Sequence, residues 1–169
     1  TIPKSPGPYP TIVLISGTGP QDRDSNIFGH RPFFVIADEL TRAGIAVLRV
    51  DDRGVGASKG DNDTANEEEK TDDVLAAMKW LSTQPGVDPK RIGLLGHSEG
   101  GVLAAMAASR ATEPAAAFVV LLGSPGIPGA ELLRTQMRLK LDAMGATKDQ
   151  IEITMKAQND AIDAVLRDA

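Results

Sequence analysis

RIGLLGHSEGG, residues 91–101, is the stretch of this 169-residue chain that decides the fold. Its first part, Arg91–Leu95, is a short apolar run typical of a buried strand. The residues from Gly100 to Ser109 are small and predict a helix. Between them lies Gly96-His97-Ser98-Glu99-Gly100, a G-x-S-x-G pentapeptide that follows a strand and opens a helix. That context is the one a nucleophile elbow requires, so Ser98 is the candidate nucleophile.

Steric crowding explains why the pentapeptide has glycine at two positions. The turn is so sharp that side chains at positions 96 and 100 would collide with neighbouring backbone, whereas the Ser98 hydroxyl would stand exposed at the carboxyl edge of the sheet. The alternative is a glycine-rich turn that happens to contain a serine, in a chain with 17 glycines. The strand before the motif and the helix after it argue against coincidence.

A second glycine loop, Ser16-Gly17-Thr18-Gly19-Pro20, ends the apolar run Thr11–Ser16. Acyl transfer needs two backbone N–H groups aimed at the developing oxyanion. We expect one from Glu99, which follows the candidate nucleophile, and one from Thr18. A dinucleotide-binding loop is an alternative, but the third glycine and the helix start that it needs are missing. A plain structural turn is the other alternative.

Two further apolar runs, Ile45–Val50 and Ala117–Leu122, complete a set of four expected strands. Helical patterns lie between them, one starting at Pro32 and one capped by Asn66. Strands that alternate with helices indicate right-handed crossovers. The sequence therefore predicts an α/β fold with a doubly wound, mainly parallel sheet of about four strands.

The pattern changes after Leu122. Residues Gly123–Gly129 form a glycine- and proline-rich loop, and from Ala130 onward only helical patterns follow. We therefore expect two parts, a partial core over residues 1–129 and a helical segment over residues 130–169.

Three blocks of the sequence resemble one family in the family's own order: Ser16–Asp24, Ile36–Ser58 and Arg91–Gly101. The chain resembles the α/β-hydrolase superfamily, and within it the bacterial esterases and serine aminopeptidase-like hydrolases. The resemblance implies a Ser–His–acid triad with Ser98 as nucleophile, and an oxyanion hole formed by Thr18 and Glu99. It also implies that the C-terminal helices are similar to the family's lid.

The base of such a triad is missing from the expected place. In α/β hydrolases the acid and then the histidine follow the serine, yet the only histidines are His30 and His97. His97 precedes the serine in the elbow, so its ring should point away from the hydroxyl, and His30 lies in an earlier loop. We therefore expect an internal fragment of a longer enzyme, without the triad acid and histidine and inactive alone.

Several acidic groups have competing interpretations. Asp51 begins the motif Asp51-Asp52-Arg53-Gly54 and could be mistaken for the triad acid, but the family's acid follows the serine, and Arg53 is expected to tie loops together. Residues 22–24 (DRD) are expected to form a loop network rather than contact substrate. Residues 61–63 (DND) are expected to be a solvated turn, because they lack the glycine and closing glutamate of a calcium loop.

Composition excludes several classes of function. The net charge of −5 argues against nucleic-acid binding, and the absence of cysteine excludes thiol chemistry. No apolar run approaches the ~20 residues of a membrane span. We expect no cofactor and no metal, and the compartment stays open between bacterial cytoplasm and export.

The expected activity is that of a serine hydrolase, first on carboxylic esters. A serine aminopeptidase or dipeptidyl-peptidase-like activity and a non-catalytic α/β module are the alternatives. The substrate would be a small ester or peptide-like molecule. Because apolar open strands invite pairing, the expected sheet edges at Ile45–Val50 and Ala117–Leu122 also predict a homo-oligomer.

Overall fold

The computed structural model describes residues 1–168 and contains the predicted parallel sheet. Its four strands are β1 (Tyr9–Ile15), β2 (Ala46–Arg49), β3 (Val87–His97) and β4 (Val119–Leu122). They are arranged in the order β2-β1-β3-β4, and every neighbouring pair is parallel. The predicted fold class is confirmed, although β3 begins earlier than the apolar run at Arg91 indicated.

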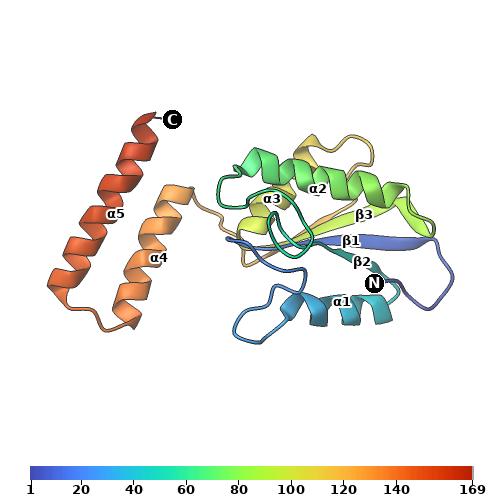
Figure 1. Cartoon of the computed structure of the whole chain (residues 1–169), viewed down its shortest axis with the longest axis horizontal. Coiled ribbons are helices and arrows are strands. Elements are labelled where there is room, and N and C mark those ends of the chain that lie inside the picture. Colours follow the sequence, from blue (N-terminus) through green and yellow to red (C-terminus); the bar gives the residue numbers. More distant parts are fainter. Residues whose placement is uncertain (169) are drawn as a thin grey trace. The chain divides into compact units, whose positions relative to one another are not determined.

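Three helices cover the two faces of this sheet (Figure 1): α1 (Pro32–Arg42), α2 (Glu67–Ser82) and α3 (Glu99–Arg110). Helix α1 lies on one face, where Phe33 and Ala37 pack against Ile12, Leu14 and Val47. Helices α2 and α3 lie on the other face. There Met78 and Leu103 join the larger core cluster with Val13, Ile15 and Ile92.

Local sequence signals fix where two of these helices start. Pro32 occupies the first turn of α1, where its missing N–H costs nothing. Asn66 caps α2 by accepting a hydrogen bond from the Glu69 amide, and the Glu69 carboxylate accepts one from the Asn66 amide. This reciprocal capping box was expected from the sequence and is present.

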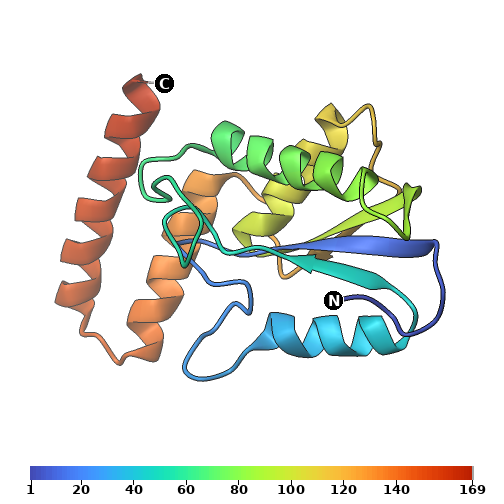
Figure 2. The same cartoon turned by 45° about the vertical axis from the view of Figure 1, so that its right-hand side comes forward.

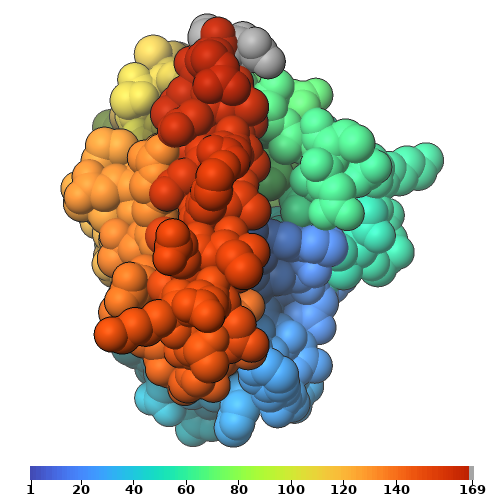
Figure 3. All heavy atoms as spheres, turned by 90° about the vertical axis from the view of Figure 1, so that its left-hand side faces the viewer, coloured from blue at the N-terminus to red at the C-terminus, as the bar shows by residue number. Residues whose placement is uncertain are grey.

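The chain divides into two compact units, with the boundary between Ser124 and Pro125. The second unit contains α4 (Gly129–Ala143) and α5 (Lys148–Asp168), which run side by side as a helical hairpin (Figures 2 and 3). Arg134 on α4 joins them by hydrogen bonds to Asn159 and Asp163. The segment over residues 130–169 was predicted to be helical; α4 and α5 run through it from Gly129 on, and residue 169 lies outside the described part.

The expected open edges differ from each other. Strand β2 lies at one edge, but Ala46 and Val47 are buried, and Val47 exchanges two backbone hydrogen bonds with Thr1. The prediction of an exposed apolar edge therefore holds only in part for β2: it is an edge strand and Val50 after it is exposed, but Thr1 pairs with its backbone at Val47. It was right for β4, whose four residues are all exposed, Leu121 by 57%.

Among the described residues, none of the helices combines the length and the hydropathy that crossing a bilayer requires.

Candidate functional site

Ser98 lies on the turn that joins β3 to α3. Its backbone has φ 54° and ψ −121°, a left-handed conformation that residues other than glycine rarely adopt. Its amide donates a 3.0 Å hydrogen bond to the Leu122 carbonyl of β4, and its own carbonyl accepts one from Gly101. Strain of this kind persists only where the surroundings impose it, and it concentrates at functional sites.

The flanking glycines are required by close packing. A Cβ on Gly96 would lie 2.0 Å from the Gly100 carbonyl oxygen, and one on Gly100 would lie 2.2 Å from the Ser16 carbonyl oxygen. Both separations are far inside van der Waals contact, and the obstructing atoms are backbone. The elbow can therefore form only with glycine at these two positions.

The loop after β1 lies beside this turn. A Cβ on Gly17 would be 3.2 Å from the Ser98 Cβ, so the loop that carries Thr18 approaches the serine closely. Within the described residues, neither the Thr18 amide nor the Glu99 amide donates a hydrogen bond. The first N–H groups of a helix have no intrahelical acceptor, which leaves the Glu99 amide available.

Asp52 anchors the same loop. Its carboxylate accepts hydrogen bonds from the Ser16 hydroxyl, at 2.7 and 2.8 Å, and from the Gln21 amide, at 2.9 Å. Burial raises the pKa of Asp52 above its ordinary value, although these hydrogen bonds and the charge of Lys70 act in the opposite direction. The loop is thus held at both ends of the segment that contains Thr18.

Glu99 and Lys70 form an ion pair next to the candidate nucleophile. Lys70 Nζ lies 3.0 Å from Glu99 Oε1, and both side chains are largely buried. Burial alone would raise the pKa of Glu99. Hydrogen bonding from Thr18 and Lys70, together with the Lys70 charge, outweighs burial, so this pKa lies below its ordinary value.

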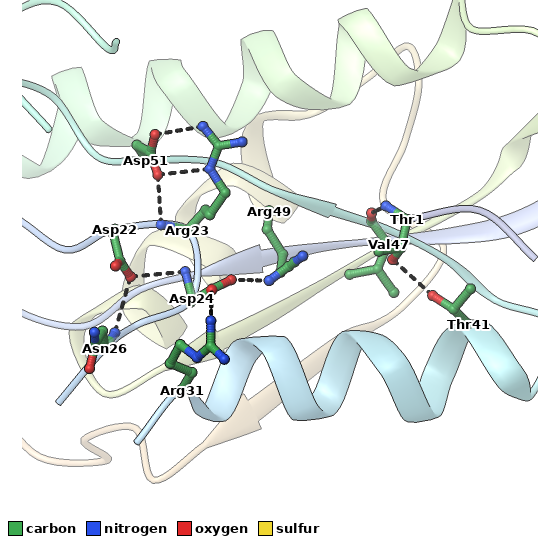
Figure 4. Close-up of polar contacts among 10 residues, drawn as sticks. All are labelled: Thr1, Asp22, Arg23, Asp24, Asn26, Arg31, Thr41, Val47, Arg49 and Asp51. Atoms are coloured by element: carbon green, nitrogen blue, oxygen red, sulfur yellow. Dashed lines mark hydrogen bonds and ion pairs between the residues drawn. The ribbon is translucent and has the colours of Figure 1, made fainter. Parts of the chain in front are cut away.

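The DRD residues of the same loop take part in a network that holds it to the end of β2 (Figure 4). Arg23 binds the Asp51 carboxylate at 2.7 Å, and Asp24 pairs with Arg49 and with Arg31. Hydrogen bonds from the Arg23 side chain and amide hold the pKa of Asp51 below its ordinary value. These contacts agree with the expected loop network.

Asp22 acts locally in this loop. Its carboxylate accepts hydrogen bonds from the Asp24 and Asn26 amides, at 3.0 and 3.1 Å. Arg53 was expected to connect loops, but it reaches a helix instead. It binds the Asp73 carboxylate and the Glu69 carbonyl, both on α2.

Neither histidine is joined to the candidate nucleophile. His97 is half-buried with its Nδ1 next to Gly17, and the exposed His30 pairs through its backbone with Ile27. In the described part of the chain, no hydrogen bond links either imidazole ring to Ser98. The described residues also contain no cluster of His, Asp and Glu side chains suited to a metal ion.

A cavity of about 870 Å³ opens beside this polar cluster. Ser16, Asp52, Lys70 and Glu99 form part of its wall, and α2 contributes apolar surface that extends to Trp80. Sequence reasoning singled out Glu99 and the motif around Asp52 but missed Lys70. No local signal marks that lysine, since its role depends on how α2 packs against the elbow.

Comparison with known proteins places the chain in a family. The family model described as X-Pro dipeptidyl-peptidase (S15 family) matches residues 1–150. The chain is 36% identical over 138 residues to esterase EstD of Thermotoga maritima, a match that covers 82% of this chain and 32% of that protein. The chain therefore spans about a third of the length of this curated relative.

Solved structures show the same fold at lower identity. The α/β hydrolase GrgF from Penicillium sp. sh18 superposes with a TM-score of 0.63 at 23% identity, covering 85% of this chain and 46% of that one. An esterase from Pyrococcus furiosus gives a TM-score of 0.61 at 23% identity, covering 90% and 52%. These likenesses support the α/β-hydrolase fold.

Proposed function

Because the chain belongs to the X-Pro dipeptidyl-peptidase (S15) family of α/β hydrolases, we propose that it is the nucleophile-bearing part of a serine hydrolase that cleaves carboxylic esters. The observation that carries the proposal is Ser98, held at φ 54° on a turn between β3 and α3 that only glycines can flank. The 36% identity with an esterase over 82% of the chain supports the choice of ester.

In the proposed reaction, the Ser98 hydroxyl oxygen attacks the ester carbonyl carbon while a base removes its proton. The carbonyl oxygen becomes an oxyanion that accepts hydrogen bonds from the Thr18 and Glu99 amides. The bond to the alcohol then breaks, the alcohol takes the proton, and an acyl group stays on Ser98 until water releases it as the acid. The base and its acidic partner would come from residues outside this chain, because neither His30 nor His97 is bound to Ser98.

The test uses the full protein to which these residues belong. We expect it to hydrolyse p-nitrophenyl esters of short acids, and Ser98→Ala to lower kcat/KM by about 10³-fold or more. Ser82→Ala, whose exposed hydroxyl bonds only the Lys79 carbonyl, is the matched control and should retain full activity. Equal hydrolysis by the Ser98→Ala protein would contradict the proposal.

The family description favours a second candidate, the removal of a dipeptide from a peptide with a free N-terminal amine. Such an activity needs a carboxylate near the nucleophile to bind that amine. Glu99 is the nearest carboxylate in the chain order. It is already paired with Lys70, so a substrate amine would have to displace that lysine to bind it.

We also propose that the isolated chain self-associates through β4. The four exposed residues Val119–Leu122 lie at the end of the strand order, and among the described strands β4 pairs with β3 alone. An apolar open strand is a template for pairing with another chain.

A further inference from the structure

We propose that Lys70 is a specificity-determining residue, because its ammonium group occupies the Glu99 carboxylate and leaves a substrate amine without an anionic partner beside Ser98. This inference rests on the proposed serine hydrolase and names its substrate class. The site would take esters whose acyl group is uncharged and would discriminate against acyl groups that carry a free amine.

The ion pair involves the residue next to the candidate nucleophile in the chain. Glu99 directly follows Ser98, and Lys70 approaches it from α2 with an Nζ–Oε1 distance of 3.0 Å. The exposed fractions of the two side chains are 18% and 22%, so water screens the pair only weakly. A substrate amine could bind Glu99 only by displacing an ammonium group that is already in place.

The neighbouring carboxylates are occupied as well. Asp52 uses both oxygens to accept hydrogen bonds from Ser16, and one of them also accepts from Gln21. The two other carboxylates of the cavity wall, Asp51 and Asp73, are bound by arginines. Every carboxylate that lines the cavity is thus satisfied by a donor of the chain itself.

The charges on the cavity wall also disfavour a substrate amine. The cavity is lined by four carboxylates and by five cationic side chains: Arg23, Arg49, Arg53, Lys59 and Lys70. A cationic substrate group would therefore meet a wall that already holds more positive than negative side chains. An uncharged acyl chain meets no such repulsion and can contact the apolar surface of α2.

The experiment compares two nearly isosteric substrates in the full protein to which the chain belongs. The p-nitrophenyl esters of pentanoic acid and 4-aminobutanoic acid differ by a methyl group in place of an ammonium group. The readout is the ratio of kcat/KM for the neutral ester over the amino ester, after subtraction of the enzyme-free rate. We expect a ratio of at least tenfold in the unmodified protein.

Lys70→Met should free the Glu99 carboxylate and lower this ratio about tenfold. Lys70→Arg keeps a cation and should keep the ratio. Lys79→Met, an exposed lysine on the same helix, is the matched control and should leave the ratio unchanged. The double variant Lys70→Met/Glu99→Gln should not show the fall, since it has no carboxylate to bind the amine.

Two results overturn the role of Lys70 even if Lys70→Met does not fold. One is an unmodified protein that hydrolyses the amino ester as well as the neutral ester. The other is a Glu99→Gln protein that loses activity selectively on the amino ester. If Lys70→Met folds, an unchanged ratio also overturns it. Absence of Ser98-dependent turnover of the pentanoate ester instead overturns the proposed function, and the specificity falls with it.

Discussion

Gly100 of the elbow and Ser16 of the loop after β1 are packed so closely that a Cβ on Gly100 would lie 2.2 Å from the Ser16 carbonyl oxygen. The helix that follows the candidate nucleophile therefore rests directly on the loop that carries Thr18. This contact brings together the two segments expected to supply the oxyanion donors. It also makes the glycine necessary for folding.

Gly100→Ala should therefore destabilise the chain. The methyl group meets backbone, which cannot rotate away, so we expect a loss of about 3 kcal/mol or more in the free energy of unfolding. Urea denaturation followed by circular dichroism measures it. Gly126→Ala, where a Cβ meets nothing within 4 Å, is the control and should change stability by less than about 0.5 kcal/mol. Equal stability of the two variants would contradict the packing argument.

Ser16→Ala tests the anchoring of the Thr18 loop by Asp52. Removal of the hydroxyl leaves a half-buried carboxylate with fewer donors, so we expect a loss of about 1–2 kcal/mol at neutral pH. The pKa of Asp52, already raised by burial, should rise further, because the lost hydrogen bond favours the ionised form. Carbon-detected NMR titration of the carboxyl groups measures the shift.

The pH dependence of the stability of Ser16→Ala follows from the direction in which the pKa of Asp52 is shifted. A raised folded-state pKa means that the contribution of Asp52 to stability is present below its unfolded value, about 3.9, and is lost as pH rises through the folded value. The stability difference between Ser16→Ala and the unmodified chain should therefore be largest at neutral pH and shrink in acid. A difference that stays constant from pH 7 to pH 3 would show that the hydrogen bond to ionised Asp52 is not its cause.

The chain of residues 1–169 alone should lack Ser98-dependent hydrolysis. A serine hydroxyl is a poor nucleophile without a base, and neither histidine is hydrogen-bonded to it. Purified chain and its Ser98→Ala variant should hydrolyse p-nitrophenyl acetate at the same rate. Clear turnover that Ser98→Ala abolishes would contradict this expectation and would direct attention to His30 or to a histidine from a neighbouring copy.

The exposed β4 strand predicts association of the isolated chain. Light scattering at high concentration should show a dimer or a larger assembly. Leu121→Lys places a charge on the most exposed residue of the strand and should shift the chain toward monomer. Lys90, an exposed residue of β3 away from this edge, offers a control through Lys90→Gln. A monomeric unmodified chain would refute the proposed edge pairing.

The sequence predicted most of the core because its signals are local. A pentapeptide between an apolar run and a small-residue helix locates Ser98, and Asn66 with Glu69 locates the start of α2. Packing between distant segments could not be predicted in this way. The covering of β2 by Thr1 depends on a contact across 46 residues, and the Lys70–Glu99 pair joins two helices across 29.

The capping box at Asn66 has a consequence at a distance from the helix end. The Lys70 amide donates to the Asn66 carbonyl, so Lys70 comes one turn after the cap. If this first turn frayed, Lys70 would lose the helical backbone that holds it against Glu99, and the carboxylate next to Ser98 would lose its counter-ion. A four-residue capping signal thus helps to hold the counter-ion of the residue after the candidate nucleophile, so a substitution of Asn66 would weaken both the start of α2 and the Lys70–Glu99 pair.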